Sequence, residues 1–240
     1  MTARYALYYA PCPDTLFHAL GANWLGRDAW TGAAPGQPAI ANIAGLTTEP
    51  RRYGFHATLK APFELAPGKS RDDLTAFAKE FARRQAPVML PKLRLAALDG
   101  FLALVPDSET EHLHELAACC VMDFDGFRGT LLPDEIQRRH RSGLSHRQGR
   151  LLLNWGYPHV LDQFRFHMTL SNKLTPADMA SLKKGAEQHF APVIGVPVRL
   201  DAITIFCEAE KAAVFRAEER FALTGKAETI WPELWKLGVR

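Results

Sequence analysis

One five-residue phrase, Phe-His-x-Thr-Leu, occurs twice in this sequence of 240 residues, as Phe55–Leu59 and again as Phe166–Leu170. The two histidines, His56 and His167, stand 111 residues apart, and each is followed two residues later by a threonine. An imidazole has an ordinary pKa of about 6.5, so it can take up or release a proton near neutral pH. The duplicated phrase therefore points to acid–base chemistry divided between two equivalent positions.

Alternation along a strand divides each copy of the phrase into an apolar face and a polar face, because residues two apart share a face. Phenylalanine and leucine occupy the apolar face in both copies, which predicts that this face is buried. The polar face carries His56, Thr58 and Lys60 in the first copy, and Arg165, His167, Thr169 and Ser171 in the second. If two lobes face each other, both polar rows line one cleft.

This set of side chains suits the cleavage of a phosphoester without a metal ion. One histidine would take a proton from water while the other gives a proton to the leaving oxygen. The hydroxyls of Thr58 and Thr169, helped by Lys60, Arg165 and Ser171, would hold the remaining phosphoryl oxygens. The alternative is that both histidines are ordinary strand residues on a solvated face, with threonines present for their β-propensity.

Metal chemistry is a weaker interpretation of the same residues. Two histidines with hydroxyls lack the Asp, Glu or Cys ligands that complete a zinc or two-metal site, and no HExxH motif occurs. We therefore expect no metal and no cofactor.

A basic stretch, Arg138–Arg150, precedes the second phrase, is rich in arginine and contains no acidic residue. Such a stretch is either a solvated helix or loop face, or an anion site for a phosphate or nucleotide. In the second case Arg138, Arg139 and Arg147 are the candidate ligands of a terminal phosphate. Two tyrosines complete the candidate set: Tyr157 is placed to stack on a base or ribose, or to pack in a turn, and Tyr8 to flank the cleft.

Composition indicates an ordinary folded protein, with 47% hydrophobic and 23% charged residues. The sequence contains no run of about 18 apolar residues, so we expect no membrane span. A net charge of +3 does not by itself indicate nucleic-acid binding. The four cysteines have no framework spacing and the N-terminus lacks the features of a signal peptide, so we expect a cytoplasmic protein.

The order strand, helix, strand, strand follows each phrase, so the phrase belongs to a repeat of about 55 residues. The first repeat is predicted as Tyr53–Leu65, Ser70–Gln85, Val88–Ala97 and Phe101–Val105, and the second as Phe164–Leu174, Pro176–His189, Val198–Cys207 and Ala213–Ala222. Outside the repeats we expect a strand at Arg4–Ala10, helices at Asp14–Gly26 and Thr110–Met122, a loop at Thr31–Arg52, and a docked tail with Trp231 and Trp235. These elements predict an α+β class: one bilobal, pseudo-symmetric domain over residues 1–240, with two antiparallel sheets and helices on their outer faces around a central cleft.

The paired motifs resemble the 2H phosphoesterase superfamily, which is named for two His-x-Thr/Ser motifs and includes 2',3'-cyclic phosphodiesterases and 2'-5' RNA ligases. The stretches "RYALYYAP", "YGFHATLKAPF" and "WGYPHVLDQFRFHMTLS" are similar to a narrower branch, often encoded beside carbon–phosphorus lyase genes for phosphonate use. The resemblance implies that His56 and His167 are the acid–base pair and that Thr58 and Thr169 bind phosphate. It also implies a small phosphorylated substrate, either a ribose cyclic phosphate or a 2',3'-cyclic nucleotide.

Two other functions remain open from the sequence. The basic stretch is compatible with a phosphodiesterase or ligase acting on RNA ends, although RNA is the less favoured partner, and a non-catalytic sensor of a phosphorylated metabolite would use the same cleft. The sequence leaves undecided the natural substrate, the ester bond that breaks, which histidine is the acid, and the oligomeric state. No membrane partner is expected.

Overall fold

The computed structural model describes residues 3–108, 110–141 and 143–226, so the predicted tail with Trp231 and Trp235 lies outside the described residues. The strands are β1 Arg4–Tyr9, β2 Ala57–Glu64, β3 Val88–Leu98, β4 Phe101–Pro106, β5 Met168–Lys173, β6 Pro197–Leu200, β7 Ala202–Glu208 and β8 Arg216–Ala222. The α-helices are α1 Leu16–Leu25, α2 Ile43–Leu46, α3 Thr48–Tyr53, α4 Arg71–Arg84, α5 Glu111–Asp123, α6 Pro133–His140, α7 His146–Trp155 and α8 Pro176–His189. Two 3-10 turns are η1 Asp125–Phe127 and η2 Leu161–Gln163.

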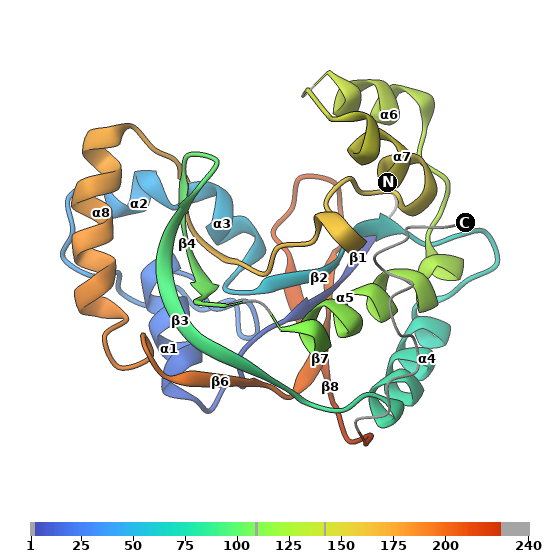
Figure 1. Cartoon of the computed structure of the whole chain (residues 1–240), viewed down its shortest axis with the longest axis horizontal. Coiled ribbons are helices and arrows are strands. Elements are labelled where there is room, and N and C mark those ends of the chain that lie inside the picture. The colour runs from blue at the N-terminus through green and yellow to red at the C-terminus, as the bar shows by residue number, and fades with distance from the viewer. Residues whose placement is uncertain (1–2, 109, 142, 227–240) are drawn as a thin grey trace.

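The strands form one antiparallel sheet in the order β6-β3-β4-β5-β2-β1-β7-β8 (Figure 1). The predicted α+β class with antiparallel strands is confirmed, but the two expected sheets are halves of one continuous sheet. The halves join between β2 and β5, where Ala57 pairs with Met168. The two copies of the repeated phrase are therefore neighbours in space at the middle of the sheet.

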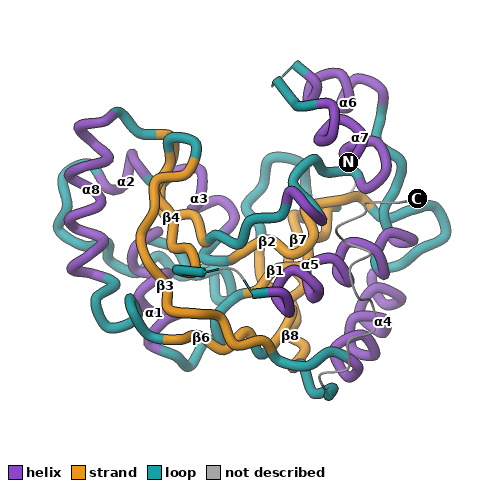
Figure 2. The backbone as a smooth tube through the Cα atoms, viewed as in Figure 1, coloured by secondary structure: helices purple, strands orange, loops and turns teal. Residues whose placement is uncertain are grey.

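The two sequence repeats are interleaved in the sheet. Strand β2 and the following helix α4 belong to one half, with α4 packed on β7 and β8. Strand β5 and helix α8 belong to the other half, with α8 packed on β3 and β4. The first repeat thus contributes β3 and β4 to the half that contains β5, and the second contributes β7 and β8 to the half that contains β2, while β6 stays in the half of β5 at its outer edge. Figure 2 shows the strands lying between α8 on one side and α4 on the other.

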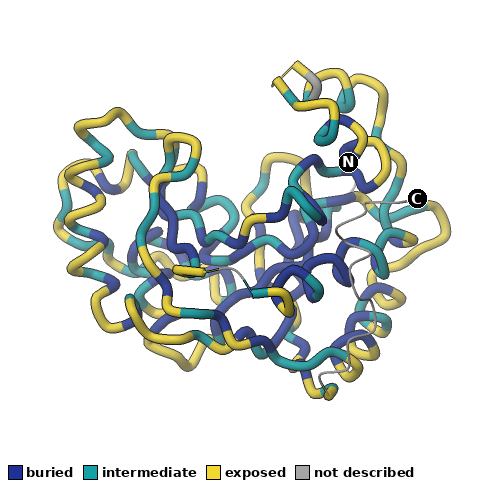
Figure 3. The backbone as a smooth tube through the Cα atoms, in the orientation of Figure 1, coloured by how far each residue is buried: buried dark blue, intermediate teal, exposed yellow. Residues whose placement is uncertain are grey.

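Alternation along the strands separates a main hydrophobic core from a smaller one. On β1, Tyr5, Leu7 and Tyr9 enter the main core, which also takes the apolar faces of α1, α4, α5 and α8. The intervening Ala6 and Tyr8 enter a small cluster on the opposite face of the sheet. The central strands are the most completely buried part of the chain, whereas α8 and the tip of the α6–α7 hairpin are largely exposed (Figure 3).

Local signals placed several element ends correctly. Ser70 and Asp73 form a capping box at α4, Thr110 caps α5, and Pro176 stands in the first turn of α8. The Asp99–Gly100 turn joins β3 to β4 with positive φ at both residues, as a tight hairpin requires.

Other boundaries differ from prediction. The helix predicted from Asp14 begins at Leu16, and its N-cap is Thr15, whose hydroxyl accepts from the amide of His18. The predicted loop over residues 31–52 contains α2 and most of α3, and the predicted strand over residues 198–207 divides at Asp201 into β6 and β7. No helix among the described residues is long and apolar enough to cross a bilayer.

Candidate active site

The two repeated histidines have the same local geometry. His56 immediately precedes β2 and His167 immediately precedes β5, so each phrase becomes a strand only after its histidine. The Nδ1 atom of His56 is 2.8 Å from the carbonyl oxygen of Gly54, and that of His167 is 2.8 Å from the carbonyl oxygen of Arg165. A carbonyl only accepts, so Nδ1 carries the proton in both rings, and Nε2 is left to accept or donate at the site.

Gly54 is required by the first of these bonds. Its φ of 81° lies in the region that favours glycine, and a Cβ there would stand 2.6 Å from Cβ of Ala29. The residue thus lets the chain leave α3, pass close to Ala29 and present its carbonyl oxygen to His56. The predicted strand over residues 53–65 is interrupted here for this reason.

The register of β2 and β5 brings the two phrases face to face. Because Ala57 pairs with Met168 in antiparallel orientation, continuing the register by one residue places His56 opposite Thr169 and Thr58 opposite His167. Directly opposed side chains share a face of a sheet. Each histidine is therefore set beside the threonine of the other copy as well as beside its own.

His56 is held against a buried aromatic ring. The ring of Tyr8 stacks on the imidazole with centroids 3.8 Å apart, and Tyr53 lies 6.0 Å away. Burial lowers the pKa of His56 to about 4; the hydrogen bond to Gly54 opposes this effect, and the charge of His167 adds to it. The imidazole is consequently neutral at pH 7, with an unprotonated Nε2 that lies 3.3 Å from the hydroxyl of Thr58.

His167 lies in the wall of a cavity of about 180 Å³ that is also lined by Thr58, Tyr157, His159 and Arg165. Its ring contacts Phe101, with centroids 5.7 Å apart. Burial lowers the pKa of His167, and the neighbouring Arg165 cation adds to this effect, while the hydrogen bond to the Arg165 carbonyl opposes it. Thr169 is half-buried on β5 and does not belong to the lining of this cavity.

Two predicted phosphate ligands, Lys60 and Ser171, are buried and make contacts within the protein, so their predicted role stays a prediction. Lys60 is 3% exposed, and its amine donates to the carbonyl oxygen of Val121, 2.8 Å away near the C-terminus of α5. Ser171 is buried, accepts from the amide of Leu102 and donates to the carbonyl oxygen of its neighbour. Strict alternation does not hold along β2, where the register with β1 shifts between Leu7 and Tyr8, next to the pairing with Lys60.

Tyr8 also differs from its predicted role. It is 1% exposed and lies under the imidazole of His56, so it supports that ring and does not flank an open cleft. Phe206 and Phe215 pack around it in the small core. Tyr8 is thus a positioning residue for His56.

The basic stretch forms α6 and α7, and its arginines have separate surroundings. Arg147 donates through Nε and Nη2 to the carboxylate of Asp162 and thereby ties α7 to η2, so its guanidinium is already engaged by an acidic residue. Arg139 donates to the carbonyl oxygen of Gly156 and to Glu135 and is half-buried. Arg138 is exposed and lines a second cavity, next to the first.

Several residues at the site were not predicted from the sequence. His159 lines the smaller cavity with Tyr157, and burial lowers its pKa. Asp99 pairs with Arg165 across 3.2 Å at the exposed rim. The contact of Asp99 with Arg165 has no local signal, because the two residues are 66 positions apart in the sequence. Among the described residues, no group of three or more His, Cys, Asp or Glu is placed to hold a metal ion.

The fold and the site define an α+β protein in which two His-x-Thr units meet at a central strand pair. The chain matches the family described as "Protein of unknown function (DUF1045)" over residues 58–216, more than half of its length, and it belongs to that family.

Curated relatives carry the name "Ribose 1,5-bisphosphate phosphokinase PhnN". The protein of Janthinobacterium sp. (strain Marseille) is 40% identical over 235 residues, covering 94% of this chain and 52% of the relative. That of Laribacter hongkongensis (strain HLHK9) is 39% identical over 215 residues, covering 89% of this chain and 50% of the relative. The chain thus spans about half the length of these relatives.

Similar solved structures include E. coli LigT in apo form, at 14% identity and a TM-score of 0.44, covering 93% of this chain and 99% of LigT. TT0787 of Thermus thermophilus is similar at 17% identity and a TM-score of 0.44, covering 94% of this chain and all of that one. A structure described as a phosphoesterase is similar at 14% identity and a TM-score of 0.42, covering 92% and 98% of the two chains.

Proposed function

We propose that this protein is a phosphodiesterase that hydrolyses a small cyclic phosphodiester, with His56 and His167 as its acid–base pair. The observation that carries the proposal is the opposed placement of the two His-x-Thr units across β2 and β5. Equal Nδ1 hydrogen bonds fix both rings and leave both Nε2 atoms for proton transfer. The resemblance of the motifs to the 2H phosphoesterases supports the same reaction.

The surroundings of the two rings favour His56 as the base. Because burial holds its pKa at about 4, its Nε2 is unprotonated at pH 7 and is able to take a proton from the attacking water. The water oxygen bonds to phosphorus, the bond from phosphorus to one ring oxygen breaks, and His167 gives its proton to that oxygen. The bound phosphate anion raises the pKa of His167 and keeps it protonated for this step.

The threonines and Arg165 stabilise the phosphoryl group in this mechanism. Thr58 and Thr169 face the opposite histidines across the strand pair, so their hydroxyls lie beside the phosphoryl oxygens of a substrate bound between the rings. Arg165 is exposed at the rim, and its pairing with the exposed Asp99 is weak in water. Its guanidinium is therefore available to an incoming phosphate.

The names of the curated relatives favour a ribose phosphate as the substrate. Opening a 1,2-cyclic phosphate of ribose 5-phosphate at the bond to O2 leaves a phosphate on O1 and gives ribose 1,5-bisphosphate, the compound in those names. A hydrolase that makes this compound would supply a kinase that consumes it. This order of reactions agrees with a place in phosphonate breakdown, which the resemblance implies.

The kinase activity named for the relatives is a weaker candidate for this chain. Nucleotide phosphates are commonly held by the motif G-x-x-x-x-G-K-S/T. Gly68, Lys69 and Ser70 match its end, but Phe63 stands where the first glycine belongs, and Ser70 instead caps α4. The relatives are about twice as long as this chain, which leaves room for a kinase outside the shared part.

The test is turnover of 2',3'-cyclic AMP and of ribose 1,2-cyclic phosphate, with and without a 5-phosphate, followed by phosphorus NMR in the presence of a chelator. His56→Ala and His167→Ala should each lower kcat/KM by about 10² or more, because each removes one proton transfer. His112→Ala is the matched control, since His112 is exposed on the first turn of α5. Full activity in both site variants would refute the proposal.

A further inference from the structure

A second cavity lies beside the cavity that contains His167. Its volume is about 650 Å³, compared with about 180 Å³ for the cavity that contains His167. Ala61, Tyr157 and Val160 line both cavities, so the two meet at Tyr157. A substrate whose reacting phosphate lies at His167 would extend past Tyr157 into the larger space.

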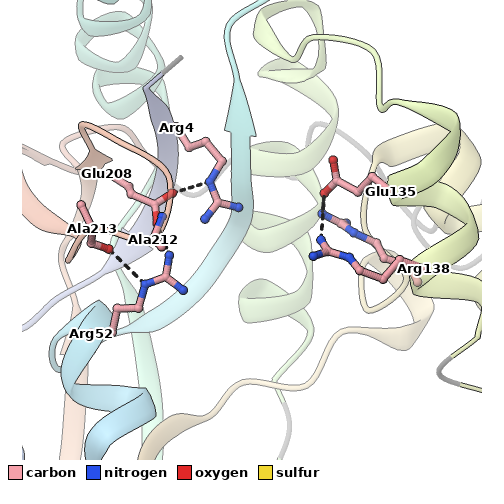
Figure 4. A network of polar contacts seen from close by, with 8 residues as sticks. Arg4, Arg52, Glu135, Arg138, Glu208, Ala212 and Ala213 are labelled. Atoms are coloured by element: carbon pink, nitrogen blue, oxygen red, sulfur yellow. Dashed lines mark hydrogen bonds and ion pairs between the residues drawn. The ribbon is translucent and has the colours of Figure 1, made fainter. Parts of the chain in front are cut away.

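One wall of the larger cavity presents an arginine fixed by a buried carboxylate. Glu208 is fully buried and is shared by Arg4 and Arg52, while it also accepts from the amide of Ala212. Two guanidinium groups on one carboxylate leave a surplus of positive charge. Arg4 uses Nε for Glu208, and its Nη groups have no hydrogen-bond acceptor among the described residues. Figure 4 shows Arg4 beside Glu208, across the view from Glu135 and Arg138.

The facing wall presents Arg138 on α6. The carboxylate of Glu135 lies 3.9 Å from Arg138 but 2.5 Å from Arg139. Its main ion pair is therefore with Arg139 and not with Arg138. The Arg138 side chain is 73% exposed, and Figure 4 shows its guanidinium turned toward the side of the cavity that holds Arg4. Lys211, in the turn between β7 and β8, also lines the cavity and has no ion pair in the described part of the chain.

Acidic residues also line this cavity, but they are fewer than its basic residues. Glu64, Asp134 and Glu135 belong to its lining, as do Lys60 and Arg128. Lys60 and Arg128 are engaged by backbone carbonyls and lie close to Asp125. The cations able to receive a new anion are therefore Arg4, Arg138 and Lys211.

We infer that this cavity is a second anion subsite, in which Arg4, Arg138 and Lys211 bind a phosphomonoester carried by the substrate. The inference rests on the proposed function and extends it: the substrate class is a cyclic phosphodiester with a second, terminal phosphate. Guanidinium groups on opposite walls suit such a phosphate, because they donate to its oxygens from two sides. Arg138 and Lys211 then determine specificity, whereas the two histidines perform the reaction.

Binding of ribose 5-phosphate tests the subsite without any turnover. Titration calorimetry of the full chain should give a Kd that rises at least tenfold in Arg138→Gln and in Lys211→Gln, with little change in His167→Ala. Arg83→Gln is the matched control, since Arg83 is 64% exposed and stands 3.7 Å from a glutamate three residues earlier, as Arg138 stands near Glu135. Its Kd should stay at the wild-type value.

Kinetics provide the second measurement. The ratio of kcat/KM for a cyclic ribose phosphate with a 5-phosphate to that without one should fall at least tenfold in Arg138→Gln. Ribose 5-phosphate binding that depends on His167 and not on Arg138 or Lys211 would overturn the inference, because the phosphate would then lie at the catalytic pair. Arg138-dependent binding of an oligoribonucleotide, without binding of ribose 5-phosphate, would also overturn it in favour of an RNA path.

Failure of the subsite and failure of the proposed reaction give different results. If the protein hydrolyses cyclic phosphates with equal kcat/KM whether or not a 5-phosphate is present, the reaction stands and the subsite is refuted. If ribose 5-phosphate binds through Arg138 and Lys211 while no cyclic phosphodiester is turned over, the subsite stands and the proposed reaction is refuted.

Discussion

Protonation of His56 should cost the folded protein stability in a defined pH window. The ordinary pKa of a histidine is about 6.5, whereas burial holds the pKa of His56 at about 4 in the folded chain. Between these values the unfolded chain binds a proton that the folded chain does not bind. The free energy of unfolding therefore falls as the pH falls from about 6.5 to about 4.

The size of this effect follows from the shift. One pKa unit corresponds to about 1.4 kcal/mol, so His56 accounts for a loss of about 3 kcal/mol across the window, and for no further loss below it. Urea denaturation at a series of pH values should show this loss in the wild type and a shallower slope in His56→Gln. NMR titration of the assigned His56 ring gives the pKa directly.

Substitution of Tyr8 is an independent way to change the pKa of His56. Its ring covers one face of the imidazole at 3.8 Å, so Tyr8→Leu should admit water and raise the pKa of His56 toward its ordinary value. The acid limb of the kcat/KM profile should then move to higher pH by the same amount as the NMR titration. A wild-type His56 that titrates above pH 6, or an equal pH slope of stability in His56→Gln, would refute this account of the base.

Three further substitutions test the structure around the site. Lys60→Met removes the amine that donates to Val121 and should lower the free energy of unfolding by about 1–3 kcal/mol in urea denaturation; an unchanged midpoint would contradict the buried contact. Arg147→Ala should lower the free energy of unfolding by about 1 kcal/mol in thermal unfolding, because the pairing with Asp162 is lost. A loss of substrate affinity larger than this loss of stability would support the predicted phosphate role of Arg147. Glu208→Gln should cost about 3–5 kcal/mol at pH 7. Burial opposes a low pKa for Glu208, but pairing with Arg4 and Arg52 lowers the pKa below its ordinary value. The stabilisation by these pairs is therefore fully present above the pKa of glutamate in the unfolded chain. It is lost as the pH falls through the pKa of Glu208 in the folded chain. Denaturation at pH 7 and at pH 3 should show that the difference between wild type and variant shrinks.

The element types could be predicted because their signals are local. The capping residues Ser70 and Thr110, the Asp99–Gly100 turn and the alternating pattern on β1 each act within a few residues of chain. The arrangement of the strands could not be predicted in the same way. Strand order in an interleaved sheet depends on pairings between distant segments, and the repeat in the sequence gives no information on which half of the sheet receives β3 and β4.

The sequence predicted the part of the candidate site that lies in the repeated phrase. It did not predict contacts that depend on strand register or on distant segments. His56 and His167 were found because the same phrase is written twice, and the structure places them in matching positions before β2 and β5. The buried position of Lys60 was missed because the register of β1 and β2 shifts beside it. Arg4 was not selected from the sequence because its place in the cavity depends on its bond to Glu208, which lies 204 residues away in the sequence. Glu208 is also bound by Arg52.

The strand pair at Ala57 and Met168 explains why the phrase must occur twice. Antiparallel pairing is locally two-fold symmetric, so one copy alone places its histidine and threonine on one side of the pair. In-line displacement at phosphorus needs a base at the attacking oxygen and an acid at the leaving oxygen, which lie on opposite sides. In the proposed mechanism the second copy supplies the missing side. His56, whose pKa is lowered to about 4 by burial, is then the proposed base, and His167, in the wall of the cavity, is the proposed acid.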